Sequence, residues 1–233
     1  AAKKRNIVVT NTPDVLTDAT AEIAILILLG AARRAKEGIK WANKKNWKWS
    51  ADFLMGKQLT DARLGILGMG RIGRAVADRA RSFGMKIHYH NRSRLDKNLE
   101  KNAVYHESLK SLLSVSDFFS INCPANKDTK HIINKETIKH FPDGAVISNS
   151  ARGDMIDDDA MVEALKSGKI YSLGLDVYNG EPNIHPEYLT LPNVFVLPHL
   201  GSATKKTRTA MADLAVKNID EFFKTGKCKN RVN

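Results

Sequence analysis

A glycine-rich turn limits the possible folds of this 233-residue chain more than any other feature. The apolar run Leu64–Leu67 leads straight into the sequence GMGRIG at positions 68–73, and a helical pattern follows over Ile72–Phe83. At such a turn the first glycine permits a tight bend, the second lets the backbone approach a diphosphate, and the third lets the helix pack closely on the strand. The start of the helix also favours a bound anion. The residues that this turn predicts to bind a dinucleotide are Gly68, Gly70, Arg71, Ile72 and Gly73.

Short apolar runs alternate with helical patterns along the chain. The expected strands are Ile7–Thr10, Leu64–Leu67, Lys86–His90, Phe118–Asn122, Ala145–Asn149, Tyr171–Val177 and Val194–Leu197. The expected helices are Thr20–Lys36, Ile72–Phe83, Ser108–Leu113, Lys135–His140, Asp158–Ser167 and Lys206–Phe223. This alternation predicts an α/β fold of the Rossmann type, a doubly wound parallel sheet with helices on both faces. The first expected strand lies apart from this unit and cannot pair with itself, which suggests a missing N-terminal portion.

The residues after the second strand of the nucleotide-binding unit indicate which nicotinamide dinucleotide is bound. An acidic residue there would bind the ribose 2′-hydroxyl of NAD, but this chain reads Asn91-Arg92-Ser93-Arg94. A carboxylate would repel a 2′-phosphate, whereas two guanidinium groups and the Ser93 hydroxyl can bind one. We therefore expect NADP(H) to be favoured. NAD(H) stays possible, because these arginines could also be solvated loop charges.

Three polar residues follow the ends of three expected strands. Arg152 follows Ala145–Asn149, Glu181 follows Tyr171–Val177, and His199 follows Val194–Leu197. Because ligands bind beyond the carboxyl ends of parallel strands, these side chains can converge although they are distant in sequence. A histidine can donate the proton that carbonyl reduction needs, a carboxylate can hold its far ring nitrogen, and a guanidinium can grip a substrate carboxylate. The set predicts reduction of a 2-keto acid.

Composition excludes several other classes of protein. Hydrophobic residues make up 42% and charged residues 27% of the chain, as in a soluble globular protein. No apolar run is long enough for a membrane span, and no signal peptide is recognisable. Cys123 and Cys228 are too few for a disulfide framework and lack metal-ligand spacing, so we expect a cytoplasmic protein without a metal site. The net charge of +12 raises nucleic acid as a partner, but the scattered basic residues favour a solvated surface.

The chain resembles the D-isomer-specific 2-hydroxyacid dehydrogenases, in particular their glyoxylate/hydroxypyruvate reductase branch. Beside the glycine turn, the motifs that carry the resemblance are Asn11-Thr12-Pro13, the stretch 16–22, Ser150-Ala151-Arg152-Gly153, Gly174-Leu175-Asp176-Val177, Gly180-Glu181-Pro182 and Pro198-His199. The resemblance implies that Arg152 binds substrate, that His199 is the acid/base, and that Glu181 is its partner. Further cofactor contacts that it implies are Cys123, Pro124, Thr129, Ser150, Ala151, Asp176 and Gly201.

The resemblance also implies an architecture and an activity. Residues 1–12 would be the remnant of a flavodoxin-like substrate domain, 13–201 the Rossmann domain, and 202–233 a C-terminal helix that returns to the substrate domain. The chain would then be N-terminally truncated. Such proteins are usually homodimers joined through the cofactor domain, with Thr20–Lys36 and the tryptophan segment (Trp41, Trp47, Trp49) at the interface. The expected reaction is NADPH-dependent reduction of glyoxylate or hydroxypyruvate; the alternative is an NAD(P)-binding regulatory protein resembling corepressors of this fold.

Overall fold

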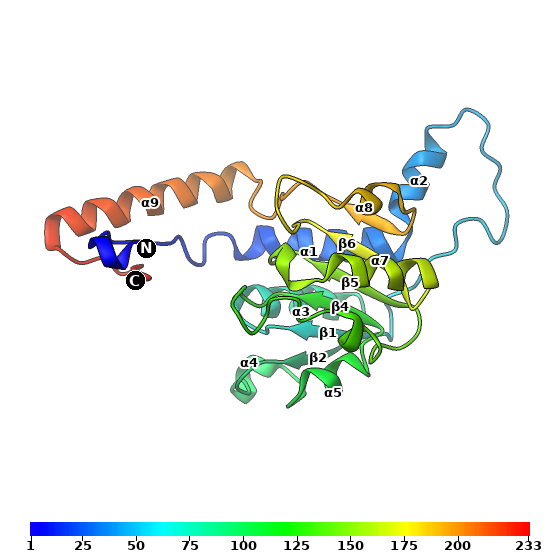
Figure 1. Ribbon diagram of the computed structural model, residues 1–233, viewed down its shortest axis with the longest axis horizontal. Helices are drawn as coiled ribbons and strands as arrows, with labels where there is room; N and C mark the ends of the chain where they lie inside the picture. The colour runs from blue at the N-terminus through cyan, green and yellow to red at the C-terminus, as the bar shows by residue number, and fades with distance from the viewer.

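A computed structural model describes all 233 residues and shows a seven-stranded, fully parallel sheet (Figure 1). The strand order is β3-β2-β1-β4-β5-β6-β7, so the chain winds outward in one direction from β1 and then in the other from β4. This is the doubly wound arrangement that the sequence predicts. The strands are β1 Arg63–Leu67, β2 Lys86–His90, β3 Val104–Tyr105, β4 Phe118–Ile121, β5 Ala145–Asn149, β6 Ile170–Leu175 and β7 Val194–Val196.

Helices cover both faces of the sheet. They are α1 Thr17–Ala32, α2 Ala35–Ala42, α3 Arg71–Ser82, α4 Lys97–Glu100, α5 Leu109–Leu113, α6 Lys135–Ile138, α7 Asp158–Ser167, α8 Pro186–Thr190 and α9 Lys205–Thr225. Two short 3-10 turns lie at Lys3–Arg5 and Gly153–Met155. Alternate strand residues point to opposite faces, so Phe118 packs with α1 and α3 whereas Phe119 packs with the layer that contains α7. The six main strands were expected from the sequence, whereas β3, α4 and α8 were not.

The strand register aligns the carboxyl ends of the main strands along one edge of the sheet. The last residues of β2, β1, β4, β5, β6 and β7 lie opposite one another in this order: His90, Leu67, Ile121, Asn149, Leu175 and Val196. The winding direction changes between β1 and β4, where the backbone amide of Asn122 donates to the Leu67 carbonyl. A crevice at such a switch point is the usual ligand site in open α/β sheets.

The first long helix ends four residues earlier than expected. The backbone amide of Lys57 donates to the Ala32 carbonyl at 2.9 Å, so a distant segment takes over a carbonyl at the end of α1. Arg34 then adopts a left-handed conformation with φ of 56°, and α2 begins at Ala35. The expectation of one continuous helix over Thr20–Lys36 is therefore wrong, because a tertiary contact ends α1 at a point that the helical pattern does not mark.

The expected strand Ile7–Thr10 is also wrong. Only Thr10 makes an isolated antiparallel bridge, to Arg231, and the backbone amide of Val232 donates to the Val9 carbonyl. A run of β-branched residues becomes a strand only beside an edge that can pair with it, and only a few C-terminal residues lie alongside. The N-terminal segment and α9 instead extend together away from the sheet (Figure 1). The division of the chain at residues 12 and 201 stays a prediction.

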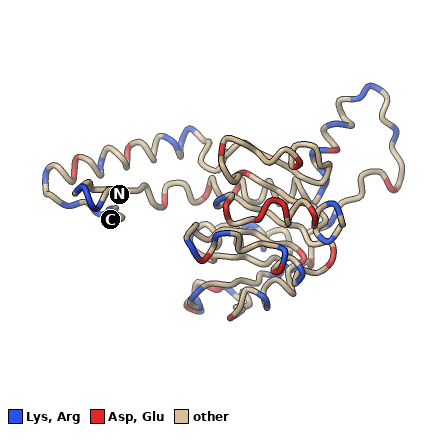
Figure 2. The backbone as a smooth tube through the Cα atoms, in the orientation of Figure 1, with Lys and Arg blue, Asp and Glu red and all other residues tan.

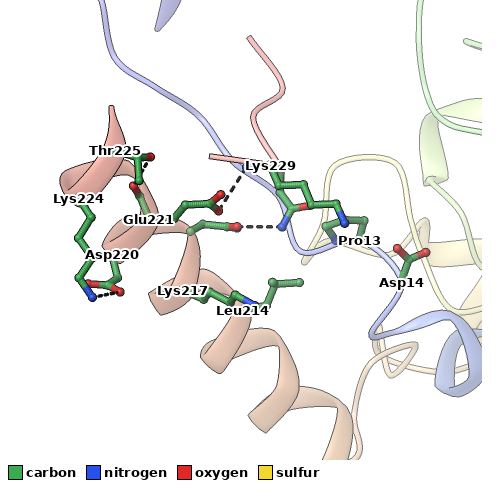
Figure 3. A pocket seen from close by; sticks show the side chains of 11 residues that line it. Pro13, Asp14, Leu214, Lys217, Asp220, Glu221, Lys224, Thr225 and Lys229 are labelled. Atoms are coloured by element: carbon green, nitrogen blue, oxygen red, sulfur yellow. Dashed lines mark hydrogen bonds and ion pairs between the residues drawn. The ribbon is translucent and has the colours of Figure 1, made fainter. Parts of the chain in front are cut away.

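A polar cavity of about 590 Å³ lies between α9 and the segment around Pro13 (Figure 3). Among its charged groups, Lys224 contacts Asp220 at 2.7 Å within α9, and Asp14 contacts Arg71 at 2.8 Å outside the cavity. It shares no lining residue with the cavity beside the glycine turn. The start of α9 is basic, and basic and acidic residues are mixed along the rest of the helix (Figure 2).

The tryptophan segment after α2 forms a protruding arm (Figure 1). Trp41 and Trp47 pack on Phe53, with ring centroids 5.6 and 6.1 Å apart, but Trp47 and Trp49 remain 49% and 77% exposed. These two side chains therefore lie on the surface, and their role at a subunit interface stays a prediction. None of the helices has the length and apolarity that a membrane crossing requires.

Candidate active site and cofactor cleft

The glycine turn after β1 has the geometry that a bound diphosphate requires. Gly68 has φ of +91°, and a Cβ there would lie 2.5 Å from the backbone nitrogen of Cys123. A Cβ on Gly73 would lie 2.2 Å from the Gly68 carbonyl oxygen, so glycine is needed for α3 to pack on the turn. A Cβ on Gly70 would meet nothing within 4 Å. Two glycines thus allow close packing, and the middle one faces open space at the uncapped start of α3.

A cavity of about 520 Å³ opens beside this turn, at the switch point between β1 and β4. The lining residues that the sequence predicted are Gly68, Gly70, Asn91, Arg92, Ser93, Cys123, Pro124 and Thr129. The lining residues that it missed are Leu67, Met69, Arg74, His90, Leu95, Asn122, Asn126, Asp128 and Ile132. Arg74 was the one detectable omission, because it lies one helical turn after Gly70 and can reach back over the glycine turn. The cavity joins the diphosphate turn to the loop after β2, as an adenosine site must.

The side chain of Asn91 has a defined orientation in this cavity. Its Oδ1 accepts a hydrogen bond from the backbone amide of Met69 at 2.7 Å. Because only the oxygen of an asparagine side chain can accept from an N–H group, its NH₂ group is the part left for a ligand. The position after β2 therefore offers a hydrogen-bond donor to the cavity, where an aspartate would offer a charged acceptor.

Two predicted cofactor residues use their side chains elsewhere. The guanidinium of Arg94 forms a bidentate pair with Glu100, at 2.8 and 3.0 Å, and Arg94 does not line the cavity. The geometry thus does not support its expected contact with a 2′-phosphate. The side chain of Arg71 pairs with Asp14 at 2.8 Å, so only its backbone, at the start of α3, is left to contact a diphosphate. Among the residues that follow β2, Arg92 and Ser93 are the ones that lie exposed at the cavity.

The three predicted catalytic residues follow the carboxyl ends of β5, β6 and β7. Arg152 is exposed, and its Nη1 donates to the carbonyl of Ala151 at 2.6 Å. His199 Nδ1 lies 2.7 Å from Glu181 Oε2, while Glu181 Oε1 accepts from the backbone amide of Tyr178 at 2.9 Å. Arg152 is close enough to Glu181 to stabilise its carboxylate electrostatically. The structure thus gathers all three residues on the rim that carries the glycine turn.

The hydrogen bond between His199 and Glu181 determines which ring nitrogen of His199 faces the carboxylate. Burial raises the pKa of Glu181, but the hydrogen bonds from His199 and the Tyr178 amide outweigh it and hold this pKa below its usual value. An ionised carboxylate only accepts hydrogen bonds, so His199 Nδ1 carries the hydrogen in this contact. Nε2 is the ring nitrogen left to face a substrate. The side chain of His199 is 52% exposed, so a ligand can reach it.

Asp176 organises the backbone around His199. Its two carboxylate oxygens accept from the backbone amides of Leu200, at 2.7 Å, and Gly201, at 2.8 Å. His199 itself has φ of 56°, a left-handed conformation that is uncommon for a residue with a side chain. Thr20 donates to the Gly201 carbonyl at 3.1 Å and holds the same loop from α1. Both oxygens hold the loop that presents His199, and each can accept one more hydrogen bond, so the expected contact of Asp176 with the cofactor stays a prediction.

Gly153 holds the Arg152 loop against the loop that bears Glu181. A Cβ on Gly153 would lie 1.9 Å from the backbone carbon of Tyr178, so the two loops touch through their main chains. We expect Gly153→Ala to force them apart and to lower the free energy of unfolding by about 2 kcal/mol or more. Urea unfolding monitored by circular dichroism measures this loss.

The matched control for this substitution is Gly38→Ala in α2. A Cβ on Gly38 meets nothing within 4 Å, so alanine there should stabilise the chain by up to about 1 kcal/mol. Equal unfolding midpoints for Gly153→Ala and the native chain would show that the two loops are not held in contact.

Comparison with known proteins agrees with this geometry. Residues 25–201 match the family model described as the D-isomer specific 2-hydroxyacid dehydrogenase, NAD binding domain. A glycerate dehydrogenase from Hyphomicrobium methylovorum is 47% identical over 226 residues, which span 96% of this chain and 70% of that protein. A glyoxylate reductase from Thermococcus litoralis is 42% identical over 237 residues, covering 100% of this chain and 72% of that protein.

Among solved structures, an NADPH-dependent glyoxylate/hydroxypyruvate reductase from Sinorhizobium meliloti, in complex with NADP and malonate, superposes with a TM-score of 0.91 at 36% identity. The match covers 99% of this chain and 72% of that one. These relatives give no support to the alternative of a regulatory protein. The chain therefore belongs to the D-isomer-specific 2-hydroxyacid dehydrogenase family and is an oxidoreductase that acts on 2-hydroxy acids or their keto forms with a nicotinamide cofactor.

Proposed function

We propose that this chain reduces a small 2-keto acid, glyoxylate or hydroxypyruvate, with NADPH as the preferred cofactor. The observation that carries the proposal is the pairing of His199 with Glu181 at 2.7 Å beside the exposed guanidinium of Arg152. The relatives named above act, by their names, on glycerate and glyoxylate, or on glyoxylate and hydroxypyruvate. These acids all carry a carboxylate next to the reacting carbon, which suits a guanidinium on the rim.

Each of the three side chains has a separate task in this reaction. The nicotinamide cofactor, when bound, supplies the hydride. Arg152 grips the substrate carboxylate and polarises the adjacent carbonyl. As negative charge develops on the carbonyl oxygen, His199 donates its Nε2 proton to it, and the carboxylate of Glu181 stabilises the charged ring before donation. In the reverse reaction His199 Nε2 accepts the hydroxyl proton.

The preference for NADPH rests on the loop after β2. The NH₂ group of Asn91, the guanidinium of Arg92 and the hydroxyl of Ser93 are all hydrogen-bond donors, and no carboxylate follows β2 directly. A 2′-phosphate accepts such bonds with both charge and geometry in its favour, whereas a 2′-hydroxyl gains little from them. Arg74 lies across the same cavity and adds positive charge.

Asn91→Asp tests this preference directly. Its carboxylate would keep the bond from the Met69 amide with one oxygen and turn the other toward the cavity, where it repels a 2′-phosphate and accepts from a 2′-hydroxyl. We expect the KM ratio of NADPH to NADH to rise about tenfold or more. Asn98→Asp, an exposed position on α4 outside the cavity, adds the same charge and should leave the ratio unchanged. An unchanged ratio in Asn91→Asp would show that residue 91 does not face the 2′ position.

A direct assay tests the activity itself. The purified chain is mixed with NADPH or NADH and with glyoxylate, hydroxypyruvate or a larger 2-keto acid, and the loss of reduced-cofactor absorbance is followed. We expect consumption with the two small acids and a lower KM for NADPH than for NADH. Tight cofactor binding without consumption of any 2-keto acid would contradict the proposal.

We also propose that the protein is a homodimer joined through the arm after α2. Sedimentation of Trp49→Ala and of the native chain, compared at the same concentration, would test this.

A further inference from the structure

Two carboxylate side chains are buried in this chain, and the catalytic site uses only one of them. Asp176 holds the His199 loop, whereas Glu100, 5% exposed, lies at the end of α4 on the other side of the cofactor cleft. Burying a carboxylate is costly unless charged and hydrogen-bonding partners surround it. The partners of Glu100 must therefore compensate for the burial of its charge, and their positions indicate its role.

Every side-chain partner of the Glu100 carboxylate lies on β2 or on the loop that follows it. Arg94 donates to both carboxylate oxygens, at 2.8 and 3.0 Å, and the Tyr89 hydroxyl donates to Oε1 at 2.6 Å. The Tyr89 hydroxyl also accepts from the backbone amide of Leu95 at 3.0 Å. The hydrogen bonds from Arg94 and Tyr89 lower the pKa of Glu100 to about 2. Burial, together with the bond to Glu100, raises the pKa of Tyr89 to about 12, so neither group titrates near neutral pH. A buried carboxylate with all of these partners favours one backbone conformation, although the Arg94 side chain is itself 59% exposed.

The network fixes the far end of the loop after β2, and Asn91 fixes its near end. Asn91 accepts from the Met69 amide, and its carbonyl accepts from the Tyr105 hydroxyl at 3.4 Å. Between these two anchors only Arg92 and Ser93 have no side-chain bond within the chain, and both line the cofactor cavity. The loop is thus held at both ends, with its free donors at the tip.

We propose that Glu100 is a positioning residue for the choice of dinucleotide: it draws Arg94 out of the cleft and braces the loop, so that Arg92 and Ser93 meet the 2′-phosphate. This inference rests on the proposed preference for NADP(H). Arg94 then holds the loop through its pair with Glu100 and does not bind the phosphate. A pre-ordered loop spares the cost of ordering Arg92 when the cofactor binds, and NAD, which lacks the phosphate, gains nothing from that order.

Calorimetric titration of NADP⁺ and NAD⁺ tests the proposal without turnover. We expect Glu100→Gln, which removes the charge and keeps the shape, to weaken NADP⁺ binding about tenfold and NAD⁺ binding less than twofold. Arg94→Gln should have the same effect, and the double variant should be no worse than either single one, because both remove the same brace. Glu100→Asp, which keeps the charge, should weaken NADP⁺ binding less than Glu100→Gln does. It replaces Glu100→Gln in the test if that variant has a lowered melting temperature.

The matched control is the pair of Arg63 and Asp117. Arg63 donates to both Asp117 oxygens, at 2.9 and 2.8 Å. This pair lies at the amino ends of β1 and β4, on the edge of the sheet away from the cofactor cavity. Asp117→Asn should lower the melting temperature and leave the ratio of the two dissociation constants unchanged.

Each contrary result has its own meaning. Loss of NADP⁺ binding in Arg94→Gln with none in Glu100→Gln would make Arg94 a direct phosphate ligand and overturn the proposal. Equal weakening of both dinucleotides would reduce Glu100 to a general structural role and also overturn it. The native chain reports separately on the cofactor: if it binds NAD⁺ as tightly as NADP⁺, the proposed NADPH preference fails before any variant is measured.

Discussion

Replacing His199 with glutamine is expected to lower kcat for 2-keto acid reduction about a thousandfold while leaving the dissociation constant for NADPH nearly unchanged. Glutamine can still bond to Glu181, 2.7 Å from His199 Nδ1, but it has no proton to donate to the developing alkoxide. Loss of a positioned general acid typically costs two to four orders of magnitude, about 10²–10⁴-fold. Steady-state kinetics with glyoxylate, together with fluorescence titration of NADPH, measures the two quantities separately.

The pH profile tests the role of Glu181. Hydrogen bonds hold the pKa of Glu181 below its usual value, so its carboxylate stays charged as the pH falls toward the usual carboxyl range. Protonation of Glu181 should therefore cause no loss of activity near neutral pH. Glu181→Gln keeps the shape of the side chain but removes the charge that holds His199 Nδ1, and it should lower kcat about tenfold to a hundredfold.

His185→Asn is the matched control for His199. His185 also faces a carboxylate, Asp159 at 3.5 Å, but it lies at the start of α8 and outside the catalytic group. Its replacement should leave kcat within about twofold, as for a substitution away from the chemistry. A His199→Gln variant that keeps most of its kcat would show that another group supplies the proton.

Local sequence patterns predict the sheet well and its periphery poorly. Buried β-branched runs such as Ala145–Asn149 mark a strand that both faces of a parallel sheet require to be apolar, and the glycine turn orders the strands around it. The two-residue strand β3 and the four-residue helix α4 are too short to show a period. The run Ile7–Thr10 has a strand pattern, yet whether it pairs depends on a neighbouring edge, which no local pattern reveals.

The site shows the same division between chemistry and geometry. Residue types and strand ends were sufficient to predict that Arg152, Glu181 and His199 gather at one rim. They were not sufficient to separate Arg92 from Arg94, because both are arginines in the same loop. Which of the two faces the cavity is decided by Glu100, whose position depends on the turn of α4. Side-chain pairing across such a turn follows from the folded backbone and leaves no spacing rule in the sequence.

Arg152→Met should lower kcat/KM for glyoxylate by about two to three orders of magnitude, because two charge-assisted hydrogen bonds to the substrate carboxylate are lost. Arg152→Lys should recover only part of this, since an ammonium keeps the charge but lacks the planar fork. The dissociation constant for NADPH should change little in either variant. Thermal melting checks that the Arg152 loop stays folded, because the guanidinium also donates to the Ala151 carbonyl.

The substrate supplies the decisive control for Arg152. The native enzyme should prefer glyoxylate strongly over an aldehyde of similar size without a carboxylate, and Arg152→Met should lose most of that preference by losing activity on the acid alone. If the variant loses equal activity on both compounds, Arg152 acts on the carbonyl or on the fold and does not grip the acid. A lost preference would place the recognition of 2-keto acids on this chain, at the exposed guanidinium that follows β5.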